Sequence, residues 1–323
     1  VVAITGSVGK TTCKNIVSTI LSQVGPVCAT WGNQNNELGV PLTLQRLSDE
    51  DRYAVLEMGA AKRGDIAYLT DMAQPDVALV TKVAPAHLAG FGSVAEIAST
   101  KGEIYSSLHD GGAAIINLDE PYAVQWLDQL RAASGNIQII TFSRASDDAT
   151  VSLLSSSMGR KGLRLEVAVN ANDGQSHCLK LAIPLLGLHN IDNVLAAIAV
   201  CLALSIELPI IERGLSAVSP EAGRLSLVDV DDQLSVIDDT YNASPESVKA
   251  AIDVLVALDD NRSTVLVLGD MAELGAQADD YHRDLGEYAA RAGVDTLLTV
   301  GEFRNSYVDG FKQVAENLSL IHI

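Results

Sequence analysis

The chain has 323 residues, with 41 acidic against 22 basic side chains and a formal net charge of −19. This negative charge excludes partners that are bound mainly by neutralising phosphates, so DNA and RNA are not expected. Hydrophobic residues make up 48% of the chain, which indicates a folded protein and excludes an acidic disordered tail. The longest apolar stretch, 194–206, is too short to span a membrane, so membrane insertion is not expected.

The length and the two ends of the chain predict its organisation. A chain of this size exceeds one usual hydrophobic core, so we expect two domains, with a large one-domain barrel as the alternative. The sequence opens at Val1 inside a strand-like run, with neither an initiator methionine nor a signal peptide. We therefore expect a piece of a longer, cytoplasmic protein. Four widely spaced cysteines without a CxxC pair indicate reduced structural thiols.

Short apolar runs alternate with helical stretches in the first 141 residues. Apolar runs of this kind predict parallel strands, because strands covered on both faces have no polar side. The alternation predicts a P-loop-type α/β domain with a mostly parallel sheet. The predicted strands are 1–5, 54–58, 77–81, 113–117 and 137–141, and the predicted helices are 10–23, 64–71, 94–108 and 122–133.

The pattern changes between residues 149 and 186. Apolar and polar residues alternate strictly in segments such as 163–167 and 179–183, which predicts antiparallel hairpins added to the same sheet. A nearly all-apolar stretch then predicts a buried helix at 190–204, and a further helix is expected at 209–218. We place the first domain at residues 1–218.

Residues 219–223 carry proline and glycine and form the best linker in the chain. After the linker, strands and helices alternate again, which predicts a second, smaller, Rossmann-like α/β domain at 219–323. Its predicted strands are 226–230, 234–238, 264–268 and 296–300, and its predicted helices are 245–257 and 279–292. Because the pattern stops after three or four strands, we expect this domain to be incomplete.

A phosphate-binding loop follows the first predicted strand, with the sequence TGSVGKTT. Glycines let backbone N–H groups surround phosphate oxygens, a lysine reaches the β- and γ-phosphates, and a threonine hydroxyl holds Mg²⁺. Strict Walker A spacing would put its first glycine at Ile4, so the loop is a shortened variant. We expect ATP and Mg²⁺ to be bound by Gly6, Ser7, Gly9, Lys10, Thr11 and Thr12.

Three classes of protein could use this loop. A GTPase would need a guanine-reading NKxD motif, which the sequence lacks. A small-molecule kinase would usually carry a lid and an arginine cluster that clamps phosphates. An ATP-dependent ligase uses a second α/β domain that closes over the acceptor carboxylate, so we favour the ligase.

Polar residues follow other predicted strands at the sheet edge where α/β proteins bind ligands. Glu57 is either an Mg²⁺ ligand or a strand-end charge in solvent. His87 is a candidate ligand, although a lone histidine is more often a surface residue. The amide-rich segment 31–41 is either a substrate-handling loop or a plain solvated loop. Lys101 has the pattern of an ordinary solvated helix lysine.

Further candidates lie later in the chain. Asn190 either caps the buried helix or recognises adenine. Arg224 either reaches a γ-phosphate or is a surface charge. Two polar strand ends of the second domain, in the segments 237–245 and 267–275, lie at the ligand-binding edge and are hard to explain by the fold alone.

Eight segments, in order along nearly the whole chain, resemble the Mur ligases of peptidoglycan synthesis. GNQNNELGVPLTL and VLGDMAELG resemble the members that act on D-alanyl-D-alanine. The family's N-terminal uridine-nucleotide-binding domain has no counterpart among the matching segments. Val8 stands where the family usually has asparagine, and the residues before Arg224 depart from the family's Pro-Gly-Arg. The other matching segments are ITGSVGKTT, VLEMGA, HLAGFGS, KGEIY, GLHNIDN and DDTYNASPES.

The resemblance implies a role for single residues at the phosphates and metal. Lys10 would contact the ATP phosphates, and Thr11 would bind one Mg²⁺. Glu57 and His87 would help to hold the metals. Lys101 matches the family's carbamylated lysine, whose modified side chain becomes an anionic Mg²⁺ ligand. Lys10, Lys101, His87 and, further on, Arg224 are therefore the expected catalytic residues.

The resemblance also implies how the nucleotide is held and what reaction follows. Asn190 would read adenine, Asp239 the ribose, with Tyr241 in the same nucleotide-binding segment, and Arg224 would contact the transferred phosphate. A carboxylate of UDP-N-acetylmuramoyl-tripeptide would attack ATP to form an acyl phosphate, which the amine of D-alanyl-D-alanine would then displace. The alternatives are another Mur-type ligase, or a fragment that binds ATP without ligase activity. A monomer is expected.

Overall fold

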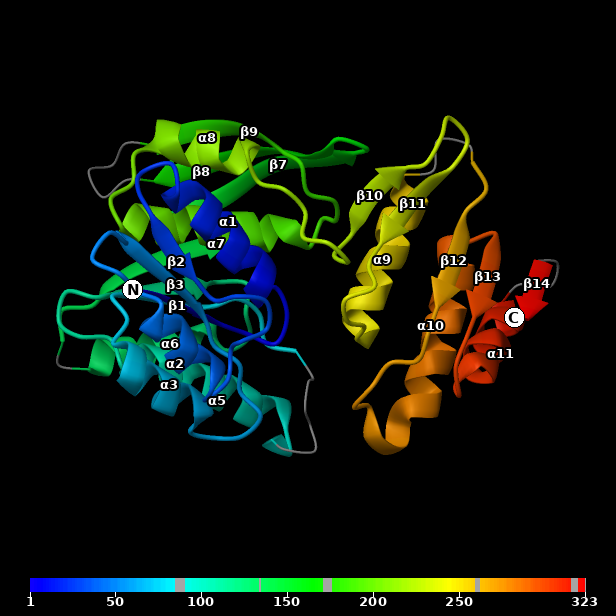
Figure 1. Ribbon diagram of the computed structural model, residues 1–323, viewed down its shortest axis with the longest axis horizontal. Coiled ribbons are helices and arrows are strands. Elements are labelled where there is room, and N and C mark those ends of the chain that lie inside the picture. Colours follow the sequence, from blue (N-terminus) through cyan, green and yellow to red (C-terminus); the bar gives the residue numbers. More distant parts are fainter. Residues whose placement is uncertain (85–90, 134, 171–175, 259–261, 315–318, 323) are drawn as a thin grey trace. The chain divides into compact units, whose positions relative to one another are not determined.

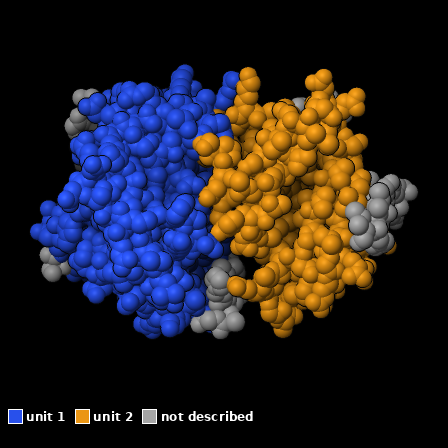
Figure 2. All heavy atoms as spheres, viewed as in Figure 1, with its two compact units in different colours: residues 1–157, 164–184, 190–218 blue, residues 158–163, 185–189, 219–323 orange. Residues whose placement is uncertain are grey.

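The computed structural model describes residues 1–84, 91–133, 135–170, 176–258, 262–314 and 319–322. The chain forms two compact units, coloured separately in Figure 2. Unit 1 comprises Val1–Ser157, Arg164–Pro184 and Asn190–Val218, and unit 2 comprises Met158–Leu163, Leu185–His189 and Ser219–Ile323. Two short segments that precede the linker in sequence thus belong to unit 2.

Unit 1 is built on one open sheet of nine strands, in the order β2-β3-β1-β4-β5-β6-β7-β8-β9. The first seven strands in that order pair in parallel. The connections between β7, β8 and β9 are too short for a parallel crossover, so these strands form antiparallel hairpins. The strands are β1 (Val2–Thr5), β2 (Val27–Ala29), β3 (Tyr53–Glu57), β4 (Val77–Val80), β5 (Ala113–Asn117), β6 (Gln138–Ser143), β7 (Val151–Gly159), β8 (Gly162–Asn170) and β9 (Ser176–Ile183).

Helices cover both faces of the parallel strands, as Figure 1 shows for α3, α5 and α6 on one face and α1 and α7 on the other. The apolar residues of α7 are buried up to Cys201, with only Leu202 and Ala203 half-buried at its end, which confirms the predicted buried helix. The open sheet with its antiparallel addition confirms the predicted fold class and excludes the one-domain barrel. The helices are α1 (Lys10–Leu21), α2 (Gly39–Gln45), α3 (Asp65–Ala73), α5 (Val94–Ser106), α6 (Ala123–Ala132), α7 (Asn190–Ala203) and α8 (Leu208–Ser216).

The sequence pattern does not predict helix α2, because its glycine and proline are typical of loops. Pro41 lies in the first turn of α2, where a missing N–H costs nothing. The side chain of Asn36 accepts hydrogen bonds from the N–H groups of Leu38 and Gly39 and so caps the helix. The amide-rich segment therefore ends in a capped helix.

Tyr105 of α5 ties two neighbouring strands together. Its buried hydroxyl donates to the carbonyl of Ile115 in β5 (2.8 Å) and accepts from the N–H of Val80 in β4 (3.2 Å). Burial is the largest cause that raises the pKa of this phenol. The hydroxyl thus satisfies two backbone groups that have no access to water.

We expect Tyr105→Phe to lower the free energy of unfolding of unit 1 by about 1–3 kcal/mol, because it leaves a buried N–H and a buried carbonyl without this partner. Urea-induced unfolding measures the change. Tyr68→Phe is the control, since Tyr68 is 55% exposed. Equal stability of the Tyr105→Phe and Tyr68→Phe variants would show that the hydroxyl does not join the strands.

The described residues of unit 2 form two separate sheets. Strands β10 (Ser226–Asp229) and β11 (Ser235–Asp238) form an antiparallel pair of their own, so the prediction that they belong to the alternating α/β pattern is wrong. The parallel sheet has the order β12-β13-β14, with β12 (Val265–Leu268), β13 (Thr296–Thr299) and β14 (Ser319–His322). Its helices are α9 (Pro245–Ala257), η1 (Gly275–Gln277), α10 (Ala278–Ala292) and α11 (Arg304–Val314), of which α11 was not predicted.

The described helices and the four cysteines agree in part with the composition of the chain. None of the helices described is both long and apolar enough to cross a membrane. All four cysteines are free thiols; Cys13, Cys28 and Cys201 are buried and Cys178 is exposed. The three buried cysteines therefore agree with the predicted structural thiols, whereas the exposed Cys178 does not.

Candidate nucleotide and metal site

The phosphate loop joins β1 to α1 and depends on two glycines. Gly6 and Gly9 have φ angles of 151° and 85°, a region that favours glycine. A Cβ atom at Gly6 would lie 1.9 Å from Oγ1 of Thr81, and one at Gly9 would lie 2.4 Å from Oδ1 of Asn193. Both glycines are thus required by backbone conformation and by close packing.

The segment after β4 holds the loop in place. Ser7 donates through its N–H to the carbonyl of Lys82 (2.7 Å) and through Oγ to the carbonyl of Ala84 (2.9 Å). Thr81 Oγ1 donates to the carbonyl of Val8 (2.7 Å). Val8, the departure from the family pattern, is thus held through its backbone. Beyond the loop, Thr11 and Thr12 lie in the first turn of α1, with Thr11 buried.

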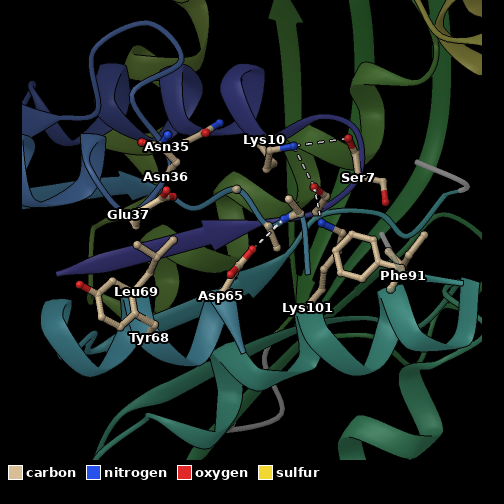
Figure 3. A pocket seen from close by; sticks show the side chains of 15 residues that line it. Ser7, Lys10, Asn35, Asn36, Glu37, Asp65, Tyr68, Leu69, Phe91 and Lys101 are labelled. Carbon is tan, nitrogen blue, oxygen red and sulfur yellow. Dashed lines mark hydrogen bonds between the residues drawn. The ribbon is translucent and has the colours of Figure 1, made fainter. Parts of the chain in front are cut away.

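Two ammonium groups converge on one carbonyl oxygen of this loop. Lys10 Nζ donates to the carbonyl of Gly6 (2.8 Å), and Lys101 Nζ, from α5, donates to the same oxygen (3.0 Å), as Figure 3 shows. Lys101 is only 4% exposed. Burial, together with the charge of Lys10, lowers the pKa of Lys101 to about 7. Near neutral pH a large share of this amine is therefore uncharged and nucleophilic.

The prediction that Lys101 is a solvated helix lysine is wrong. Lys101 follows Ile97 by four residues and precedes Ile104 and Tyr105, all of which are buried. This spacing puts the lysine on the buried stripe of α5. The helical period of the apolar residues was the signal that could have identified it.

A cavity of about 410 Å³ lies beside the two lysines. Asn35, Asn36 and Glu37 line one part of it, which favours the ligand-handling interpretation of the amide-rich segment (Figure 3). The remaining lining residues are Gly6, Ser7, Lys10, Gly59, Ala60, Ala61, Asp65, Tyr68, Leu69, Phe91, Ile97 and Lys101. The cavity thus combines ammonium groups, amides, carboxylates and apolar side chains.

Glu57 ends β3 and pairs in register with Ile4, next to the start of the phosphate loop. It is 2% exposed, so the alternative of a strand-end charge in solvent is wrong. Asn35 Nδ2 donates to Oε1 of Glu57 (2.8 Å), whereas Oε2 is buried and has no hydrogen-bond partner in the described structure. A buried carboxylate oxygen in this state is costly unless a cation binds it. The residue therefore fits a ligand of Mg²⁺.

The structure describes only some of the other expected metal ligands. His87 lies outside the described residues. Among the residues that are described, no three His, Cys, Asp or Glu side chains gather as a metal site would require. The residues expected to hold an Mg²⁺ ion here are Glu57, the hydroxyl of Thr11 and a Lys101 converted into an anion, together with His87.

Asn190 and its neighbour lie close to the phosphate loop. Asn190 begins α7 and is buried, and its Oδ1 accepts a hydrogen bond from Nδ2 of Asn193 (2.8 Å). Asn193 is also the residue that packs against Gly9. Asn193 thus connects Asn190, which is expected to recognise adenine, to the loop that is expected to bind the phosphates.

Three expected nucleotide-binding residues come together within unit 2. The guanidinium of Arg224 lies 4.2 Å from the centre of the Tyr241 ring and 3.3 Å from a carboxylate oxygen of Glu221. Asp239 accepts a hydrogen bond from the N–H of Leu225 (3.2 Å), and desolvation raises the pKa of this carboxyl. The three side chains therefore form one polar cluster at the start of the unit.

The sequence pattern suggests that the fold alone does not explain the polar strand ends of the second domain. For Asp270 this interpretation is wrong. Its carboxylate accepts the N–H groups of Glu302 (2.7 Å) and Phe303 (3.0 Å), just before α11. The next residue, Met271, donates its N–H to Nε2 of the buried His282 (3.1 Å). Hydrogen bonds to the turn that precedes α11, a helix that sequence reasoning had missed, account for this carboxylate.

Comparisons with known proteins agree with this architecture. A profile of the Mur ligase middle domain matches residues 4–201, and one of the Mur ligase, glutamate ligase domain, matches residues 223–319. The chain is 40% identical over 304 residues to UDP-N-acetylmuramoyl-tripeptide--D-alanyl-D-alanine ligase of Escherichia coli (strain K12), covering 94% of this chain and 64% of the relative. It is 34% identical over 310 residues to the enzyme of the same name from Bacillus subtilis (strain 168), covering 96% and 64%. The chain thus spans about two thirds of the length of these relatives.

Solved structures resemble the chain over nearly all of its length. MurF from Acinetobacter baumannii matches with a TM-score of 0.87 and 34% identity, over 99% of this chain and 67% of the other. MurF ligase from Thermotoga maritima, solved in complex with ADP, matches with a TM-score of 0.82 and 28% identity, over 99% and 69%. The middle-domain profile alone covers more than half of the sequence, and the chain therefore belongs to the Mur ligase family.

Proposed function

We propose that this chain is the ATP-binding part of a ligase that joins D-alanyl-D-alanine to UDP-N-acetylmuramoyl-tripeptide in peptidoglycan precursor synthesis. The observation that carries the proposal is the convergence of Lys10 and Lys101 on the phosphate loop, beside a cavity lined by Asn35 and Asn36. Because the chain has a net charge of −19, an anionic nucleotide would be attracted by these two local cations and not by the protein as a whole. The identity to relatives of that name supports the choice of substrates.

The residues of the loop would bind and orient ATP. Backbone N–H groups at the start of α1 and the ammonium of Lys10 would neutralise the phosphates and place the γ-phosphate toward the cavity. Glu57, Thr11 and a modified Lys101, with His87, would hold Mg²⁺, which supplies further neutralisation of charge on the transferred phosphoryl group. In the adjoining cavity, the substrate carboxylate would be held for attack, and the resulting acyl phosphate would acylate the dipeptide amine.

Carbamylation of Lys101 is part of this proposal. Two ammonium groups that share one acceptor repel each other, and the neutral form of a buried amine is the one that can react with CO₂. The carbamate would carry a negative charge, so its interaction with Lys10 would become attractive and it could bind a divalent cation. The low pKa of Lys101 and its contact with Gly6 support this assignment.

The remaining roles are proposed on the same basis. Asn190 would recognise adenine from its position near the phosphate loop. Asp239 and Tyr241 would contact the nucleoside, and Arg224 the transferred phosphate. We further propose that the domains correspond to residues 1–218 and 219–323, and that the protein acts as a monomer in the cytoplasm, where ATP and nucleotide-linked precursors are available.

Release of inorganic phosphate tests the reaction. The ligase is expected to release phosphate from ATP only when both UDP-N-acetylmuramoyl-tripeptide and D-alanyl-D-alanine are present, because the acyl phosphate is consumed by the amine. A coupled phosphate assay with either substrate omitted is the control. Transfer of phosphate to a stable product without release would support a kinase instead. Tight ATP binding with no release of phosphate, even when both substrates are present, would support the alternative of an ATP-binding fragment.

A further inference from the structure

The segment after β2 surrounds Glu57 on several sides. Thr30 Oγ1 accepts the N–H of Glu57 (2.9 Å), and the N–H of Thr30 donates to the carbonyl of Val55 (3.0 Å). Asn35 donates through Nδ2 to Oε1 of Glu57 (2.8 Å) and accepts through its carbonyl the N–H of Gly59 (2.7 Å). The backbone before and after Glu57, and one of its two carboxylate oxygens, are therefore held by the same short segment.

A buried lysine attaches this segment to the helix of the phosphate loop. Lys14 is 3% exposed, and its Nζ donates to the carbonyl of Thr30 (2.9 Å). It lies one turn after Lys10 on α1, so Lys10 and Lys14 extend from the same side of the helix. A chain of hydrogen bonds thus runs from α1 through Thr30 to Glu57.

The two oxygens of Glu57 are in different situations because of Asn35. Oε1 is occupied by the amide, and Oε2 is the buried oxygen that lacks a hydrogen-bond partner in the described structure. An amide is neutral, so it fixes the carboxylate without cancelling the negative charge that a divalent cation needs. A lysine or arginine in this position would fix the carboxylate but compete with the cation.

Gly59 leaves the room that the amide needs. A Cβ atom at Gly59 would lie 2.7 Å from Oδ1 of Asn35, closer than ordinary contact allows. Asn35 and Gly59 both line the cavity that contains Lys10 and Lys101. The amide group therefore belongs to a residue that both lines the cavity and binds the buried carboxylate.

We propose that Asn35 is a positioning residue for the metal-binding carboxylate: it holds Oε1 of Glu57 so that Oε2 is presented to the cation, and Lys14 anchors the segment that carries it. The inference rests on the proposed function in one respect, because it takes Glu57 as a ligand of Mg²⁺. It assigns to Asn35 no contact with the reacting atoms. Its effect is therefore expected in cation affinity and not in affinity for the nucleotide alone.

The test measures Mn²⁺ binding by electron paramagnetic resonance on the 323-residue chain with saturating ADP, and ADP binding by calorimetry without metal. Asn35→Ala is expected to weaken Mn²⁺ binding about 10-fold, the lower end of the effect of removing a partner of a metal ligand, and to leave metal-free ADP affinity unchanged. Asn33→Ala is the matched control, since Asn33 is an exposed asparagine of the same segment. It is expected to change neither affinity.

A second variant displaces the amide without removing it. Gly59→Ala places a methyl group against Oδ1 of Asn35 and is expected to weaken Mn²⁺ binding in the same direction, with metal-free ADP affinity again unchanged. Wild-type Mn²⁺ affinity in Asn35→Ala, or an equal loss of Mn²⁺ and metal-free ADP binding, would overturn the positioning role while the proposed function stands. Absence of nucleotide-dependent Mn²⁺ binding in the wild-type chain would instead contradict the metal site of the proposed function.

Discussion

Replacement of Lys10 by alanine is expected to weaken ATP binding by about 100-fold. The ammonium lies in the phosphate loop, 2.8 Å from the carbonyl of Gly6, where a β- or γ-phosphate would be within reach. Charge-assisted hydrogen bonds contribute about 1.5–3 kcal/mol each, and about 1.4 kcal/mol corresponds to a tenfold change in affinity. Isothermal titration calorimetry with ATP and Mg²⁺ measures the loss.

The control for this substitution is Lys62→Ala. Lys62 is an exposed lysine of the same unit that does not line the cavity, so its removal changes the net charge equally. We expect Lys62→Ala to bind ATP like the wild type. Unchanged ATP affinity in Lys10→Ala would refute the assignment of residues 5–12 as a phosphate loop.

Replacement of Lys101 by arginine is expected to lower ligase activity by about 100-fold or more. The assay uses a longer protein that includes this chain and has the length of the matched relatives. Arginine keeps a positive charge but forms no carbamate, so both the anionic metal ligand and the neutralisation of Lys10 are lost. Steady-state phosphate release measures the effect. Intact-mass measurement of the native wild-type protein should show the added mass of one CO₂, which Lys101→Arg should lack.

The pH dependence of the modification follows from the pKa of Lys101, which burial and the charge of Lys10 lower to about 7. Below that pH the amine is protonated and does not react, and above it the neutral, reactive form dominates. Added bicarbonate is therefore expected to raise activity more at pH 8 than at pH 6. Full activity of a wild-type protein whose mass shows an unmodified lysine would remove carbamylation from the mechanism.

The elements that sequence patterns predicted well are those whose residues interact locally or are buried throughout. The apolar strands β1, β3, β4 and β5 were recognised because parallel strands covered on both faces have no polar side. Helix α9 was predicted with its bounds because Ser244 and Pro245 mark its start, and Ser244 indeed forms a capping box with Ser247.

The elements that were missed have a different origin. Helix α2 contains a glycine and a proline, and only the cap from Asn36 shows that they belong to a first turn. Helix α11 follows a turn after Gly301, and the N–H groups of this turn bind Asp270, which lies more than 30 residues earlier in the sequence. Partners so distant along the chain leave no local pattern.

The phosphate loop could be identified from the sequence alone, because its residues are adjacent in the chain. Gly6 and Gly9 shape the backbone around the phosphates, and Lys10 supplies the positive charge. The family followed from motifs of the same local kind. What the tertiary structure decided is the electrostatic state of single side chains. Lys101 and Glu57 resemble surface charges in the sequence, yet packing of α5 and of β3 buries both and takes them out of water.

Burial changes the chemistry of these two residues, since desolvation disfavours a charge and makes each hydrogen-bond partner count. It lowers the pKa of Lys101 and leaves one oxygen of Glu57 without a hydrogen-bond partner in the described structure. The partner of the other oxygen, Asn35, is 22 residues away along the chain. Such contacts exist only once the strands have paired, so the sequence identified the nucleotide loop, whereas the fold determined how a metal ion could be held beside it.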